Sequence, residues 1–192
     1  MDRAQFWAMV EAARPASDVD GQDCQQHTVQ LIAALRELPA SEILDFERLQ
    51  QELKLEAYRW DLWGAAHLLG GGGCSDSGFI AFRGWLLAQG RATWEGALRD
   101  PDSLATHPQV RGLPREQRWL GGWFQCEEVL YVADEAYLQQ TGEDLPLEQV
   151  PGGPLPAEPH GQRWDPDDDE HLRRRYPRLF AWLHDAPPPW EA

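Results

Sequence analysis

The side chains that could do chemistry gather near the middle of the chain, where two carboxylates, Asp61 and Asp76, accompany the guanidinium of Arg83. On a helix, the residues one turn after Asp61 are Gly64 and Ala65, so its carboxylate would lie in a notch of small residues. Such a notch permits another backbone or a ligand to approach closely. Because an unpaired buried charge is costly, the carboxylate also needs a partner, and Arg83 is the candidate.

Two helices that fold back on each other about the glycines at 70–73 would bring Asp61, Asp76 and Arg83 together. Two interpretations of that cluster stay open. One is an internal network of ion pairs that orients the two helices. The other is a polar pocket, for which the candidate ligand-binding residues are Tyr58, Asp61, Trp63, Ser75, Asp76, Arg83 and Trp85.

Cys74 precedes the second of these helices, and a thiol beside a helix N-terminus can have a lowered pKa. A cysteine nucleophile also needs a base nearby, and neither His67 nor His107 stands in a recognisable pattern with it. The alternative is a small buried thiol. If the protein is an enzyme, the catalytic candidates are Asp61, Cys74, Asp76 and Arg83.

Glu127 and Glu128 are candidates for a divalent cation site, because the stretch that follows Cys126 carries a carboxylate at nearly every helical turn. Paired with Asp61 or Glu56, one of them could supply oxygen ligands. A solvated helix face explains the same carboxylates, and the six histidines show no zinc-binding spacing. We therefore expect no cofactor, and metal-dependent hydrolysis stays a variant of the enzyme hypothesis.

The glycines at 70–73 do not form a phosphate-binding loop. A P-loop needs a preceding strand and a lysine after its last glycine, whereas a helical pattern precedes this stretch and no lysine follows it. The dinucleotide-binding pattern fails for the same reason. Ser75, Asp76 and Ser77 have short oxygen-bearing side chains of the kind that cap helices, so the stretch predicts a tight bend and then a capped helix.

The elements that would position these residues are helices. Apolar residues recur at helical spacing in most of the chain, and no convincing alternating strand longer than four residues is present. The pattern predicts a mainly α, single-domain irregular helical bundle. Its centre is a hairpin of helices at about 42–69 and 76–89. Asp2 and Asp23 should cap helices, and Gly90 and Gly142 should stop them. Further helices are expected at about 3–14, 24–38, 93–98 and 126–140.

The end of the chain differs in composition from the rest. Five prolines and two glycines fall within residues 146–159, which is typical of an exposed linker or a wrapping arm. We therefore divide the chain into a helical domain at 1–142 and a Pro/Gly-rich arm with short terminal helices at 143–192.

Charge and cysteine content narrow the function classes. The net charge of −15 disfavours binding to nucleic acid and to anionic membranes, and it is compatible with a basic protein partner or with solubility alone. The three cysteines are widely spaced and include no CxxC pair, and residues 1–10 show no signal peptide. These features indicate a reduced cytoplasmic protein.

Four stretches resemble one bacterial family, known as domain of unknown function 4240. They are FW at 6–7, AYRWDLWGAAHLL at 57–69, GGCSDSGFIAFRGWLLAQG at 72–90 and DPDSLA at 100–105, and the resemblance covers roughly residues 1–140. Members of that family typically have a second aspartate where this chain has Ser77, which argues against a metal held by two adjacent carboxylates. The resemblance implies a bacterial cytoplasmic protein and carries no known activity, substrate or cofactor.

We expect a binding or interaction module that uses the polar site between the two central helices. Strong acidity, many aromatic residues and the lack of a recognisable catalytic set favour this function. The alternative is an enzyme that uses Asp61, Asp76 and Arg83, which requires these side chains to point into a concave pocket. A purely structural domain in a larger complex is a third possibility.

Overall fold

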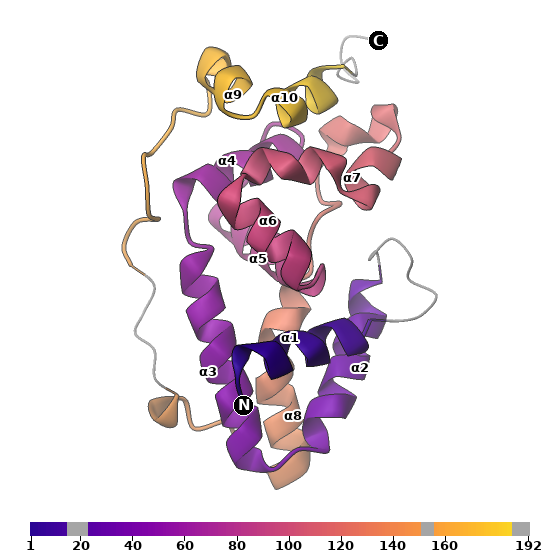
Figure 1. Cartoon of the computed structure of the whole chain (residues 1–192), viewed down its shortest axis with the longest axis vertical. Helices are drawn as coiled ribbons and strands as arrows, with labels where there is room; N and C mark the ends of the chain where they lie inside the picture. Colours follow the sequence, from indigo (N-terminus) through magenta and orange to yellow (C-terminus); the bar gives the residue numbers. More distant parts are fainter. Residues whose placement is uncertain (15–22, 151–155, 186–192) are drawn as a thin grey trace.

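The computed structural model of the chain describes residues 1–14, 23–150 and 156–185 (Figure 1). Within these ranges the chain is helical, with one isolated β-bridge and no strand, which confirms the mainly α, irregular helical bundle. The α-helices are α1 (Arg3–Ala12), α2 (Cys24–Arg36), α3 (Ala40–Glu56), α4 (Trp60–Leu69), α5 (Asp76–Ala88), α6 (Arg91–Arg99), α7 (Pro108–Gly112), α8 (Val132–Thr141), α9 (Asp169–Arg175) and α10 (Pro177–His184). Short 3₁₀ helices are η1 (Pro101–Thr106), η2 (Arg115–Leu120), η3 (Glu127–Tyr131) and η4 (Leu147–Gln149). None of the helices in the described part of the chain has the length and apolar composition needed to cross a bilayer.

Four helices build one end of the molecule, where α8 packs against α2 and α3, and α1 contacts the same two helices (Figure 1). The inward face of α3 follows the helical spacing of its apolar residues, since Ile43, Phe46 and Leu53 are buried. Asp2 and Asp23 cap the N-termini of α1 and α2, as expected from their short carboxylates. Local signals therefore account for the buried face of α3 and for the starts of α1 and α2.

The ends of two helices also agree with the prediction. α5 stops just before Gly90, and α8 ends at Gly142. The start of α8 differs, because the helix expected from Cys126 begins with the 3₁₀ turn η3 and becomes an α-helix only at Val132.

The helix expected at about 42–69 is divided into α3 and α4. Between them, Arg59 has extended backbone angles of φ −138° and ψ 140°. At this break the Tyr58 carbonyl accepts a hydrogen bond from the His160 N–H, and the Trp60 N–H donates to the His160 carbonyl, both at 2.9 Å. The helical pattern hides the break because the partner of these backbone groups lies far away in the arm.

The predicted hairpin is formed by α4 and α5, which contact each other beyond the glycine loop at 70–73. Gly71 and Gly72 have φ angles of 74° and 81°, which residues with a side chain rarely adopt, so the loop requires glycine here. Ser75 then caps α5, since its Oγ accepts a hydrogen bond from the Gly78 N–H at 3.1 Å. The loop is therefore the predicted tight bend followed by a capped helix.

A disulfide between Cys24 and Cys126 joins the start of α2 to the segment before η3, with Cα atoms 5.5 Å apart. This bond corrects the expectation that the cysteines are reduced, and among the described residues only Cys74 is a free thiol. A sequence separation of 102 leaves no local signal for the pairing.

The C-terminal arm passes the break between α3 and α4 and continues to α9 and α10, at the opposite end of the molecule from α8 (Figure 1). There α10 packs against α4 and η1. Asp102 of η1 caps α10, because its carboxylate accepts the N–H groups of Arg178 at 3.1 Å and Leu179 at 2.8 Å. The division of the chain at residue 142 into a domain and an arm stays a prediction.

Reduction of the Cys24–Cys126 disulfide should lower the free energy of unfolding by about 4–5 kcal/mol, because the bond closes a long loop and removes entropy from the unfolded chain. Urea unfolding with and without dithiothreitol measures the difference. Cys74→Ser is the matched control, since it removes the free thiol and keeps the disulfide. Equal stability in both redox states would contradict this expectation.

Glu47 should give the stability a pH dependence. It is buried on α3, its Oε2 has no hydrogen-bond partner within the described ranges, and burial raises the pKa of its carboxyl from 4.5 to about 7. The folded chain therefore holds this proton more tightly than the unfolded chain, and stability should fall by up to about 3 kcal/mol as the pH rises from about 4.5 to beyond 7. Glu47→Gln should abolish that decrease in unfolding experiments across this range. A variant with the same pH slope as the wild type would show that another group titrates.

Candidate functional site

Asp61 lies in the first turn of α4 and pairs with arginines from the break and from the arm. Its carboxylate accepts two hydrogen bonds from Arg59, at 3.0 Å from Nε and at 2.6 Å from Nη2, and a guanidinium nitrogen of Arg175 lies 3.5 Å away. The Arg59 guanidinium also donates to the Leu98 carbonyl at 3.1 Å. The charge of Asp61 is therefore compensated by Arg59 and Arg175 rather than by the predicted partner, Arg83.

The predicted notch beside Asp61 is filled by Tyr176 from the arm. The ring lies so close to Gly64 that a Cβ atom there would be 2.3 Å from the phenolic oxygen. The Tyr176 hydroxyl donates to the backbone carbonyl of Asp61 at 2.7 Å. Burial raises the pKa of Tyr176, so the hydroxyl keeps its proton at neutral pH. The notch permits a close approach, as expected, and its occupant is the chain's own arm.

Arg83 is buried on α5 and packs against aromatic rings. Its Nη1 donates to the Lys54 carbonyl at 2.9 Å, and its guanidinium lies 5.2 Å from the ring centroid of Tyr58 and 5.0 Å from that of Phe79. Burial lowers its pKa, and it forms no ion pair with any residue that the structure describes. The structure therefore does not bring Asp61 and Arg83 together.

Asp76 lines a cavity of about 390 Å³, which we term the aromatic pocket. The pocket lies between the start of α4, the start of α5 and the arm. From the helical core it is lined by Tyr58, Trp60, Trp63, His67, Cys74 and Asp76. From the arm, Glu158, Arg163 and Trp164 contribute to its wall. Four of the predicted site residues thus share this pocket.

Three stacked rings form what we term the aromatic column, and two of them, Trp60 and Trp63, line the pocket. Phe79 stacks on Trp63 with ring centroids 4.6 Å apart, and Trp63 stacks on Trp60 at 5.4 Å. The guanidinium of Arg163 lies 5.2 Å from the Trp60 centroid. Since Arg83 lies over Phe79, each end ring of the column contacts a cation, one from the core and one from the arm.

Trp164 of the arm contacts α4 beside the aromatic pocket. Its Nε1 donates to the Trp60 carbonyl at 2.8 Å, and its ring packs edge-on against His67 with centroids 5.1 Å apart. Burial lowers the pKa of His67, so this imidazole is neutral at neutral pH. Together with the main-chain pair of His160, which forms an isolated β-bridge with the break, these contacts hold the arm beside the aromatic pocket.

A second cavity, of about 510 Å³, also includes Trp164 in its wall and is lined mainly by polar residues. Arg59, Asp61, Arg175 and Tyr176 line it. Because Asp61 is already paired with both arginines, these charged groups serve to hold the arm against the core.

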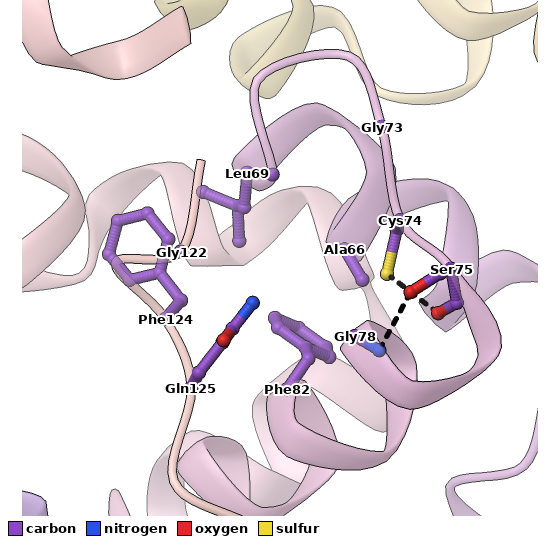
Figure 2. A pocket seen from close by; sticks show the side chains of 11 residues that line it. Ala66, Leu69, Gly73, Cys74, Ser75, Gly78, Phe82, Gly122, Phe124 and Gln125 are labelled. Atoms are coloured by element: carbon purple, nitrogen blue, oxygen red, sulfur yellow. Dashed lines mark hydrogen bonds between the residues drawn. The ribbon is translucent and has the colours of Figure 1, made fainter. Parts of the chain in front are cut away.

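Cys74 and Ser75 also face a smaller cavity, of about 120 Å³, beside the glycine loop (Figure 2). Figure 2 shows these two residues on one side of the cavity and Phe124 and Gln125 on the other. The Ser75 Oγ is used to cap α5. Burial raises the pKa of the Cys74 thiol to about 11, so the thiol is protonated at neutral pH and is a poor nucleophile.

Glu127 and Glu128 lie on η3 and are not part of the aromatic pocket. Glu127 accepts a hydrogen bond from the Tyr131 hydroxyl at 3.1 Å. A carboxylate oxygen of Glu128 lies within 4.8 Å of the sulfur atoms of Cys24 and Cys126. Those sulfurs are joined in the disulfide and so offer no thiolate to a metal ion.

The residues around the pocket differ in part from those that the sequence predicts. Trp85 is buried elsewhere, where its Nε1 donates to the side chain of Gln109 at 2.5 Å. For Trp164 and Tyr176 the available signal was an aromatic residue in the arm, because such a ring needs an apolar surface to pack on. The missed residues are Trp60, Arg163 and Trp164 at the aromatic pocket, and His160 and Tyr176 at the polar cavity beside it.

Gly64→Ala should displace Tyr176 and lower the free energy of unfolding by about 1–3 kcal/mol, because the new methyl group would overlap the phenol. Gly73→Ala is the matched control, since nothing lies within 4 Å of a Cβ atom there. Urea unfolding measures the stability, and limited proteolysis reports whether the arm detaches. If Gly64→Ala behaves as Gly73→Ala does in both assays, Tyr176 does not occupy the notch.

A family model described as "Protein of unknown function (DUF4240)" matches residues 1–139. The break at Tyr58–Trp60, the aromatic column and Gly64 lie inside the matched region, whereas the arm residues that contact them lie outside it. Searches of curated proteins and of solved structures found no match to this chain. By the extent of the family match, the chain belongs to the DUF4240 family, whose function is unknown.

Proposed function

We propose that the protein is an interaction module that binds an extended segment of a basic partner at the break between α3 and α4. The backbone of the partner would pair with the Tyr58 carbonyl and the Trp60 N–H, as His160 of the arm does. Main-chain pairing with an extended segment is a recurrent mode of peptide recognition. The partner would take the place of the arm.

The observation that carries this proposal is the way in which the arm itself is held. His160 makes both main-chain hydrogen bonds at the break. The Trp164 side chain adds a third, in which its Nε1 donates to the Trp60 carbonyl. These contacts need only an extended segment with a suitable aromatic residue. A partner segment of that kind could form the same set.

The charge of the protein favours a basic partner. The net charge of −15 would attract a basic protein and raise the rate of association, and it would repel acidic competitors. Asp76 brings one of these negative charges to the aromatic pocket itself.

The enzyme hypothesis has less support. Asp61 is paired with two arginines, Arg83 is buried against rings, and neither of them lines the aromatic pocket. Cys74 does line the pocket, but its raised pKa opposes formation of the thiolate that catalysis would need.

A labelled peptide with the sequence of residues 156–166 tests the proposal when it is added to the full chain. Trp164→Ala removes the hydrogen bond between the arm and Trp60 and should weaken the competing arm. In fluorescence anisotropy titrations, the Trp164→Ala chain should therefore bind the peptide about fivefold more tightly than the wild type, which corresponds to about 1 kcal/mol. A peptide with Glu158→Lys and Asp165→Lys should bind the Trp164→Ala chain more tightly than the unmodified peptide does, because the protein is acidic. Added salt should reduce this gain in affinity.

Two substitutions of Trp60, made in the Trp164→Ala chain, separate the backbone from the side chain. Trp60→Leu keeps the N–H group, whereas Trp60→Pro removes it. Proline is tolerated at the first position of a helix, and Arg59 already has the extended angles that proline requires of its predecessor. The peptide should bind the Trp60→Leu chain about fivefold more tightly than the Trp60→Pro chain. Equal affinities, or no binding to any chain, would overturn the proposal.

A further inference from the structure

At the end of the aromatic column that faces the arm, the Trp60 ring contacts the cation of Arg163. What we conclude from this contact rests on the proposed function. We infer that the partner segment carries an arginine or a lysine whose side-chain cation replaces Arg163 on the Trp60 ring. Arg163 is then an intramolecular competitor of the partner's cation.

The two cations at the ends of the column are held differently. Arg83 is only 2% exposed and is fixed by its hydrogen bond to the Lys54 carbonyl. Arg163 is exposed, and within the described ranges it forms neither a hydrogen bond nor an ion pair. The face of Trp60 is thus its principal contact, as expected for a cation–π interaction. A cation held in this way can be exchanged for another.

The charges around the pocket favour a cation as the replacement. When the arm leaves, Arg163 and Glu158 leave with it, and Asp76 stays on the core side. His67 lines the same side, and burial keeps it neutral at neutral pH. An incoming carboxylate would therefore meet a negative charge, whereas an ammonium or guanidinium group would meet an aromatic face and a carboxylate.

The core side of the pocket offers a wall for a long side chain. With the arm docked, the cavity of about 390 Å³ has walls from both the core and the arm, so the core wall is the part that the partner would meet. The Trp63 Nε1 donates to the Cys74 carbonyl at 3.0 Å, which fixes the orientation of the central ring of the column. A long side chain could lie along the pocket wall and place its cation over Trp60.

Four peptides based on residues 156–166 test the inference on the full Trp164→Ala chain. They carry arginine, lysine, citrulline or norleucine at the position of Arg163, so that citrulline keeps the shape of arginine without its charge. The arginine or the lysine peptide should bind roughly three- to thirtyfold more tightly than both neutral peptides, and the stronger of the two identifies the preferred cation. This preference should vanish with Trp60→Leu and persist with Trp60→Phe, which keeps an aromatic face.

The outcomes separate the inference from the proposed function. If all four peptides bind equally well to the chain that retains Trp60, the cation is not recognised, and binding at the break still stands. A preference that persists in full with Trp60→Leu would overturn the inference as well, because the overall charge would then explain it. If none of the peptides binds, both the proposed function and the inference fail.

Competition within the otherwise unchanged chain supplies a second measurement that needs no substitution at Trp60. Arg163→Gln should raise the affinity for the arginine peptide by roughly three- to thirtyfold, because it removes the built-in cation. Arg174→Gln is the matched control, since it makes the same change of charge on an exposed arginine of α9. Equal effects of the two substitutions would show that Arg163 does not compete for a defined site.

Discussion

The backbone at residues 58–60 determines how the candidate site is arranged. The chain leaves the helical path here, and the carbonyl of Tyr58 and the N–H of Trp60 need partners outside their own helices. His160 supplies both, which places the arm beside the start of α4. The extended conformation of Arg59 at the same point lets its guanidinium reach the Asp61 carboxylate.

The position of the arm explains the other contacts of the site. Tyr176 enters the notch beside Gly64, and Trp164 and Arg163 reach Trp60. Each of these contacts joins the region matched by the family model to a segment beyond it. The core surface that the arm covers combines the main-chain groups that His160 pairs with, aromatic faces and a carboxylate, and this combination is suited to an extended segment with a cationic side chain.

Sequence patterns predict those parts of the fold that depend on neighbouring residues. The buried spacing of Ile43 and Phe46, the Ser75 cap and the stop at Gly142 are each specified within a few positions. Helical periodicity could not reveal the break at residues 58–60, because the hydrogen bonds that stabilise it come from the arm. The Cys24–Cys126 disulfide escaped prediction for the same reason.

The structure brings some of the predicted site residues into one pocket and gives Asp61 partners other than the predicted Arg83. Tyr58, Trp63 and Asp76 do line one pocket. Asp61 pairs with Arg59, two positions away, because the extended break turns that side chain back along α4, which a continuous helix would not do. Arg83 lies over the aromatic rings of Tyr58 and Phe79 instead of pairing with Asp61.

The central claim is that the arm occupies the main-chain groups at the break, and hydrogen exchange of the Trp60 backbone N–H tests it most directly. Trp60 is the first residue of α4, where an N–H has no acceptor within its own helix, so only His160 can protect it. Residue-resolved exchange should show slow exchange of this N–H in the wild type and faster exchange in the Trp164→Ala chain. Exchange of the Trp60 N–H at the unprotected rate in the wild type would contradict the account.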